Sequence, residues 1–164
     1  MAAQTVHRDA ADYRQLRFQS VDDCIAEVQR IRAADEKGSL RALGNWTPGQ
    51  ILTHVAAWIE YAYVGYPIHP PPLFVRWILR LRLRHTLTTG MPRGVRIPGL
   101  KEGTVGMEDV ATSLAAERLL SALQRLRDEE QATFDSPAFG AMSHDDRIQL
   151  NLRHAELHLS LLDY

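Results

Sequence analysis

The most informative stretch of this 164-residue chain runs from residue 46 to residue 56 and reads Trp46-Thr47-Pro48-Gly49-Gln50-Ile51-Leu52-Thr53-His54-Val55-Ala56. Thr47 followed by Pro48 is typical of a helix start, because a hydroxyl caps the first free amides and proline fits the first helical position. Apolar residues then recur at helical spacing as far as Gly65. His54 falls in the middle of that apolar face, where a histidine side chain faces an interior or a pocket.

Cap signals and apolar spacing indicate four further helices. They are expected over about Val21 to Lys37, Leu73 to Leu87, Glu108 or Asp109 to residues 128–131, and His144 to Leu162. Strand-like alternation is sustained nowhere, and the glycine-rich segment from Thr88 to Gly106 is expected to be a long loop. We therefore expect an all-α fold in one domain, residues 1–164, with four principal helices and an additional short one.

Composition excludes several classes of function. Lys and Arg number 19 against 20 Asp and Glu, a formal net charge of -1, so no general electrostatic attraction to nucleic acid is expected. No uncharged apolar stretch reaches the ~18 residues of a membrane span. The first 18 residues lack the apolar core of a secretory signal, so we expect no membrane partner and a cytoplasmic location. The lone Cys24 excludes an internal disulfide framework.

Three histidines form a candidate metal site. His154 and His158 stand one helical turn apart, so their rings share a face and can reach one ion. A third ligand must come from another helix, and His54 is the best candidate. Ligand nitrogens about 2.0–2.1 Å from an ion are expected within about 3–3.5 Å of one another. The alternative is that these are ordinary core histidines, since seven histidines make chance pairs common. Glu156 is expected on the solvated face.

The stretch Trp46–Ala56 resembles the second-helix motif of the DinB-like superfamily, and a terminal histidine motif of that superfamily is similar to Arg153-His154-Ala155-Glu156-Leu157-His158-Leu159. The chain looks closest to the branch called domain of unknown function 1569, through Arg17-Phe18, Gly44-Asn45-Trp46 and Phe139-Gly140. The resemblance implies an up-down four-helix bundle with a metal bound by His54, His154 and His158. Leu157 departs from relatives that place a further histidine there.

Four residues near the ligand positions are candidates for a pocket: Gln50, Trp58, Tyr61 and Asn151. They lie one or two turns from His54 or about one turn from His154, where they can orient ligands or line a substrate pocket. For each of them, plain packing between helices is the alternative. The Thr88 to Gly106 loop is expected to cover one end of the bundle and to roof this pocket.

The helix from Phe74 to Leu87 is rich in arginine, with Arg76, Arg80 and Arg84 in one stripe. One interpretation is a helix that binds an anionic ligand or a membrane surface. The interpretation that we favour from sequence is a solvated arginine face, with the helix packed over one end of the bundle.

Our functional hypothesis is a metal-binding protein, with Zn²⁺ or Ni²⁺ suited to three imidazoles. The resemblance implies a thiol-dependent transferase or isomerase, with bacillithiol, mycothiol or glutathione as the small-molecule thiol; a metal-dependent hydrolase is also compatible with three histidines and an open position. The competing hypothesis is a non-enzymatic binding or interaction protein with a structural or vestigial histidine site. For the oligomeric state, a homodimer is one possibility.

Overall fold

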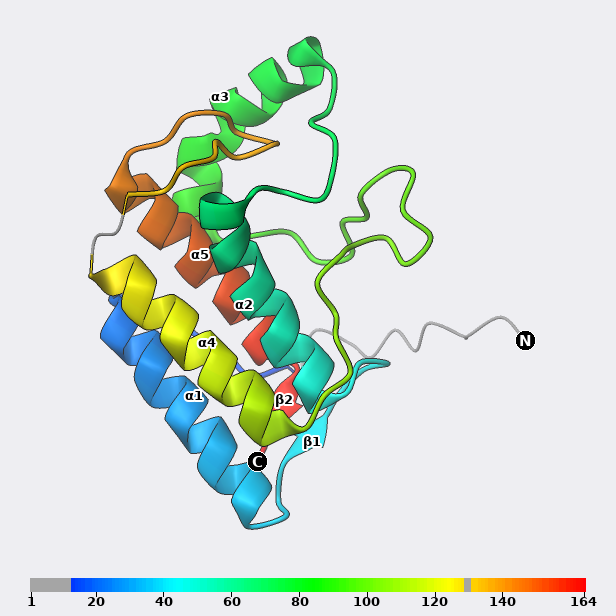
Figure 1. Cartoon of the computed structure of the whole chain (residues 1–164), viewed down its shortest axis with the longest axis vertical. Helices are drawn as coiled ribbons and strands as arrows, with labels where there is room; N and C mark the ends of the chain where they lie inside the picture. Colours follow the sequence, from blue (N-terminus) through cyan, green and yellow to red (C-terminus); the bar gives the residue numbers. More distant parts are fainter. Residues whose placement is uncertain (1–12, 129–130) are drawn as a thin grey trace.

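The computed structural model describes residues 13–128 and 131–164 and is mostly helical (Figure 1). In chain order its elements are α1 (Val21–Glu36), β1 (Arg41–Ala42), α2 (Pro48–Val64), α3 (Leu73–Thr89), α4 (Thr112–Arg127), α5 (His144–Leu159) and β2 (Leu162–Asp163). The expected all-α class is confirmed, since the two strands have two residues each. The expected fading of α4 around residues 128–131 falls partly outside the described residues, as does most of the N-terminal segment.

Three helix starts carry the caps that the sequence predicts. Ser20 accepts a hydrogen bond from the backbone N–H of Asp23, whose carboxylate accepts the amide of Ser20 in return. Thr47 and Gln50 form the same reciprocal pair at the start of α2. At α5 the hydroxyl of Ser143 accepts the backbone amide three residues later. Each cap satisfies an otherwise free amide and contributes about 1 kcal/mol to stability.

Helices α1, α2, α4 and α5 share one apolar core. Its buried members recur at three- and four-residue spacing along each helix, so each helix turns one apolar face inward. The largest buried apolar side chains are Ile31, Ile51, Leu52, Ile59, Leu119, Leu123, Leu126, Leu152, Leu159 and Leu162. This core holds α2 and α5 side by side, which matters for the histidines that they carry.

The four core helices do not simply alternate in direction, because α3 lies between α2 and α4 in the chain. In Figure 1, α1 and α5 run down the page, whereas α2 and α4 both run up it. The chain returns between α2 and α4 through α3 and the long 90–111 segment, so these two core helices are parallel. Helix α3 has 17 residues, as many as α2, and is therefore not the short additional helix that the sequence suggests. Its main packing partner is α5.

Helix α4 begins at Thr112, so the predicted start at Glu108 or Asp109 is wrong. The preceding residues are held along the first turns of α2. The hydroxyl of Thr53 donates to the carbonyl oxygen of Glu108 at 2.9 Å, and the hydroxyl of Thr47 donates to the carboxylate of Asp109 at 2.9 Å. Bonds to another element replace the helical turn that the local sequence favours.

The end of the chain also differs from expectation. Helix α5 ends at Leu159 rather than at Leu162, because β2 pairs antiparallel with β1, joining Arg41 to Asp163 and Ala42 to Leu162. Only the tertiary fold brings these two short segments together. No described helix is long and apolar enough to cross a membrane.

Two buried carboxylates hold the segment that precedes α1. Glu27 accepts hydrogen bonds from Arg14, from Arg30 at 2.8 Å and from the hydroxyl of Tyr164 at 3.0 Å. Burial alone would raise the pKa of Glu27, but the bonds from Arg14 and Arg30 outweigh burial and hold the pKa below its ordinary value. Glu27 thus ties both ends of the described chain to α1.

Glu156 is the second of these carboxylates, and it is only 8 % exposed, so its expected place on a solvated face is wrong. It accepts the backbone amide of Phe18 at 2.6 Å and pairs with Arg153 at 3.1 Å. Arg153 in turn donates to the carbonyl oxygen of Phe18 at 2.5 Å. Glu156 and Arg153, which point away from the histidines of α5, therefore hold the segment before α1 in place.

Candidate metal centre

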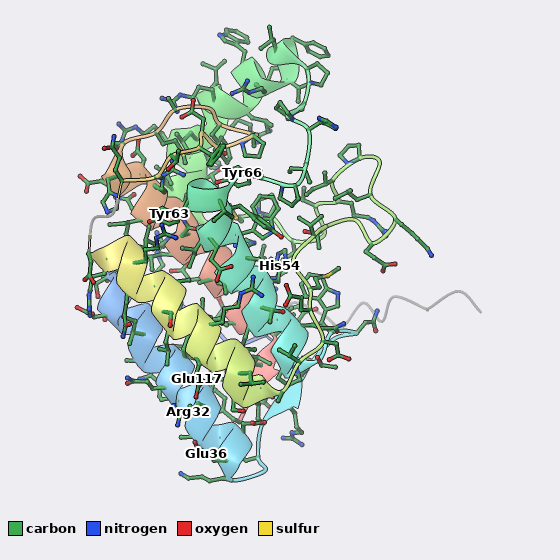
Figure 2. The ribbon with its side chains drawn as sticks, in the orientation of Figure 1. Arg32, Glu36, His54, Tyr63, Tyr66 and Glu117 are labelled. Carbon is green, nitrogen blue, oxygen red and sulfur yellow. The ribbon has the colours of Figure 1, made fainter. Side chains whose placement is uncertain are left out.

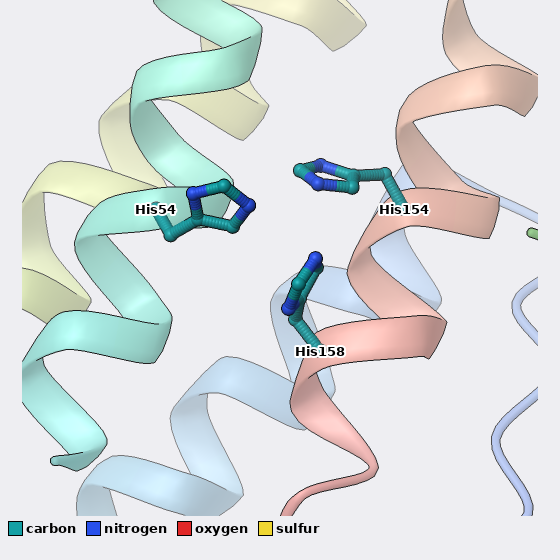
Figure 3. A group of neighbouring side chains, drawn as sticks. All are labelled: His54, His154 and His158. Atoms are coloured by element: carbon teal, nitrogen blue, oxygen red, sulfur yellow. The ribbon is translucent and has the colours of Figure 1, made fainter. Parts of the chain in front are cut away.

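Three histidines meet between α2 and α5. His54, 2 % exposed, lies midway along α2, on the side that faces the 90–111 segment (Figure 2). His154 and His158 lie one turn apart on α5 and are half-buried. One ring nitrogen of each histidine lies within 4.8 Å of the others. Figure 3 shows the three rings turned toward the same space between the two helices.

The rings stand edge to face around that space. Ring centroids are 5.0 Å apart for His54 and His154, 4.5 Å for His54 and His158, and 4.6 Å for His154 and His158. The 4.8 Å limit on the nitrogen separations is wider than the about 3–3.5 Å expected around a bound ion. Modest rotation about the soft second side-chain torsion of histidine can close that difference. The arrangement therefore suits an ion held by three imidazoles.

The tautomer of His54 is set by the 90–111 segment. Its Nδ1 atom lies 2.8 Å from the carbonyl oxygen of Val105. A carbonyl oxygen only accepts, so Nδ1 carries the proton and the Nε2 lone pair remains available to a metal. Ligating histidines commonly use their second nitrogen in this way, which orients the ring and raises its basicity. No feature of the sequence identified Val105 as this partner.

The environment keeps all three rings neutral. Burial lowers the pKa of His54 to about 4, against a small opposing effect of the bond to Val105. Burial lowers the pKa of His158 to about 3, with repulsion from His54 and Arg93 adding to it. Burial also lowers the pKa of His154 well below its ordinary value. Protons therefore compete weakly for these nitrogens at neutral pH, which is what metal binding requires.

Further features of the three histidines fit a metal. The Nδ1 atom of His158 is buried and has no hydrogen-bond partner among the described residues, so no protein contact fixes the tautomer of this ring. Within residues 13–128 and 131–164 the cluster consists of imidazoles, with no thiolate or carboxylate. Neutral imidazole donors suit Zn²⁺, Ni²⁺ and related divalent ions, and three of them leave a position for a further ligand.

Aromatic side chains surround the histidines. Trp46 stacks on His158, with centroids 5.5 Å apart and planes 7° apart, and it meets the ring of His54 edge-on at 5.1 Å. The ring centroid of Trp58 lies 5.8 Å from that of His154 and 6.1 Å from that of His54. The pocket prediction did not include Tyr66, whose ring centroid lies 5.9 Å from that of Trp58. These rings place the histidines in surroundings of low polarity.

The four predicted pocket residues lie in different surroundings. Trp58 contacts two of the histidines, and the ring centroid of Tyr61 lies 6.0 Å from that of Trp58. The side chain of Gln50 is engaged in the cap of α2, and Asn151 donates to the carbonyl oxygen of Arg147 within α5. The assignment of all four to a pocket stays a prediction. Trp46 belonged to the quoted stretch, but only the fold shows that its ring lies against those of His54 and His158.

The 90–111 segment packs closely against α2 at Gly106. Gly106 has φ +79°, and a Cβ built there would lie 2.6 Å from the Cβ of Ala57 and 3.1 Å from the hydroxyl of Tyr61. Next to it, Arg118 of α4 pairs with Glu60 at 2.7 Å and with Glu108 at 3.1 Å. Close packing and these ion pairs hold the segment where Val105 can reach His54.

A protein-family model matches nearly the whole chain. The family model described as protein of unknown function (DUF1569) matches residues 10–163. No curated protein and no solved structure matches the chain.

Proposed function

The chain belongs to the DUF1569 family of proteins of unknown function, and we propose that it binds a divalent metal through His54, His154 and His158 and uses it to act on a small-molecule thiol. The observation that carries this proposal is the convergence of three neutral imidazoles from two helices, one of them oriented by the carbonyl of Val105. Zn²⁺ or Ni²⁺ is the proposed ion.

The proposed fold family is the DinB-like four-helix bundle. The supporting arrangement is a core shared by α1, α2, α4 and α5, with one candidate ligand on α2 and two on α5. The histidine motifs in residues 46–56 and 153–159 resemble those of that superfamily. Thiol-dependent transfer or isomerisation is the activity that this resemblance implies.

A divalent ion held by His54, His154 and His158 would supply a Lewis acid that favours a thiolate over a thiol at neutral pH. In the proposed transfer the thiol loses its proton to solvent, and its sulfur forms a bond to an electrophilic carbon. The leaving group then departs with the bonding electron pair. The role of the protein is to orient the site: Val105 fixes one ring, while Trp46 and Trp58 limit water around the histidines.

Spectroscopy of the cobalt-substituted protein tests thiol binding. Addition of 2-mercaptoethanol or glutathione should change the cobalt spectrum at concentrations below about 1 mM, the usual range of substrate affinities. Ethylene glycol, which replaces sulfur by oxygen, is the matched ligand control and should leave the spectrum unchanged. His158→Ala should not respond to thiol. If no thiol changed the spectrum of the cobalt-substituted wild type, the proposal would be contradicted.

A non-enzymatic binding protein is the second candidate. It is favoured by one observation: among the residues that the structure describes, no carboxylate or thiol joins the three imidazoles in their cluster, so the cluster itself offers no acid or base for proton transfer. The two functions differ in turnover. Metal-loaded protein that binds thiol but consumes it no faster than His158→Ala, in the presence of an alkyl halide or an epoxide, would establish the non-enzymatic function.

A further inference from the structure

Helix α3 presents an apolar face to solvent. Its buried residues are Leu83 and Leu87, both in its C-terminal half. Five large apolar side chains are between 49 % and 79 % exposed: Leu73, Phe74, Trp77, Ile78 and Leu81. At about 100° per residue they fall in one stripe along the helix. A contiguous exposed apolar face of this kind marks an interaction surface rather than scattered surface residues.

Two arginines of the predicted stripe, Arg80 and Arg84, are exposed, as the sequence suggested, and Arg76 is half-buried. Arg80 donates to the carbonyl oxygens of Phe139 and Ala141, and Arg84 pairs with Asp146 at 3.7 Å. These contacts turn one side of α3 toward α5 and the segment before it. The apolar stripe is also exposed, which the sequence interpretation did not anticipate, and α3 projects beyond the other helices in Figure 1.

The surroundings of the apolar stripe are strongly basic. Residues 61–101 contain seven of the 19 Lys and Arg of the chain and none of its 20 Asp and Glu. At about 100° per residue, Arg82 lies at one border of the stripe, 100° from Leu81, and Arg84 lies 60° from Leu81 on the other side, between Trp77 and Leu73. Both are exposed, so their long side chains can reach anionic groups while their stems lie along apolar surface.

We propose that α3 binds the surface of an anionic lipid bilayer, with Phe74, Trp77 and Leu81 inserted at the level of the headgroups. A helix with tryptophan and leucine on one face and arginine at its borders is the pattern of a helix that lies in the plane of a membrane. It does not cross the bilayer, since no described helix is long and apolar enough. Each arginine near anionic lipid strengthens binding about fivefold.

Charge decides between a bilayer and a second copy of this chain. Two α3 helices packed stripe to stripe would bring two sets of arginines together without an acidic side chain on either helix. That repulsion opposes self-association through this face. Anionic lipid headgroups instead complement every arginine of the helix that reaches the surface.

Vesicle flotation tests the proposal with the whole chain. Wild type should bind phosphatidylcholine vesicles that contain about one-third phosphatidylserine at least tenfold more tightly than pure phosphatidylcholine, and salt should weaken that binding. Trp77→Ser with Leu81→Ser should weaken it at least tenfold, and Arg82→Gln, which removes an arginine outside the contacts of α3 with α5, should weaken it about fivefold. Leu114→Ser, which removes a leucine that is 60 % exposed on α4, is the matched control and should bind like wild type.

Trp77→Phe separates the location of binding from its strength. This variant should still bind anionic vesicles but should lose most of the blue shift of tryptophan emission, because the remaining Trp46 and Trp58 lie beside the histidines. All variants are first compared with wild type by circular dichroism and thermal melting, and only those that fold like wild type are scored.

Three results would overturn the proposal. They are equal binding of wild type to both vesicle types, no binding by wild type, and binding that the α3 variants do not weaken. A dimer that Leu81→Ser dissociates would assign the face to a second copy instead.

Discussion

The Nδ1 atom of His54 lies 2.8 Å from the carbonyl oxygen of Val105, which links the middle of α2 to the 90–111 segment. The bond assigns the proton of His54 to Nδ1 and leaves Nε2 for a ligand. The position of Val105 depends in turn on Gly106, which packs directly on α2. The segment before α4 is thus part of the candidate metal centre and not a passive connection.

Gly106→Ala should weaken metal binding about 10- to 100-fold, the usual effect of losing a contact that orients a ligand. The added Cβ would lie 2.6 Å from the Cβ of Ala57, so the segment that carries Val105 must move away from His54. Affinity is measured by competition with a chromogenic chelator. Gly99→Ala is the matched control, because Gly99 also has a positive φ, +84°, but has no atom within 4 Å of the added Cβ. Equal affinities of the two variants would show that the bond to Val105 does not influence the site.

His154→Ala should abolish the rise in melting temperature that Zn²⁺ or Ni²⁺ causes in wild type. Metal that binds only the folded chain stabilises it by mass action, by about 2.7 kcal/mol at 100 times the dissociation constant. Differential scanning fluorimetry with and without metal measures the difference. His69→Ala, which removes an exposed histidine outside the helices, should keep the full rise. A rise of the same size in His154→Ala would place the bound metal elsewhere.

Glu27→Gln should lower the free energy of unfolding at pH 7 by about 2–4 kcal/mol, because Arg14 and Arg30 lose a buried partner. The folded-state pKa of Glu27 lies below its ordinary value. The charged network therefore stabilises the fold above the unfolded-state pKa, and its contribution is lost as pH falls through the folded-state pKa.

The difference between wild type and Glu27→Gln should accordingly shrink between about pH 5 and pH 3, near and below the ordinary pKa of a glutamate. Urea denaturation at several pH values measures it. Glu36→Gln is the control, since Glu36 forms an exposed pair with Arg32 on the outer side of α1 (Figure 2) and such pairs contribute little. A difference that stays constant over this pH range would contradict the role of the Glu27 carboxylate.

Gly49→Ala should destabilise the protein, although alanine normally favours a helix over glycine by about 1 kcal/mol. A Cβ at Gly49 would lie 2.0 Å from the backbone oxygen of Val110, so α2 and the segment before α4 must separate. Chemical denaturation should show a loss of at least about 1–3 kcal/mol, the usual effect of overpacking. Gly44→Ala adds a Cβ with no atom within 4 Å and should leave stability within about 0.5 kcal/mol of wild type. A stabilised Gly49→Ala would refute this close approach.

Features that depend on neighbours within a few turns could be predicted from the sequence. The caps at Ser20, Thr47 and Ser143 start helices where they were predicted, because a cap is formed by residues only three positions apart. The shared face of His154 and His158 follows from helical geometry alone. The choice of His54 as the third histidine rested on its place in an apolar face, and the structure brings it to the other two.

Features that join segments distant in the chain could not be predicted in this way, because they depend on long-range packing. The start of α4 at Thr112 depends on bonds to α2, and the end of α5 at Leu159 depends on pairing with residues more than a hundred positions earlier. The burial of Glu156 depends on the segment at Phe18. The outward apolar face of α3 depends on which side of the helix docks on α5. Local patterns state which residues share a face, but only long-range packing decides where that face points.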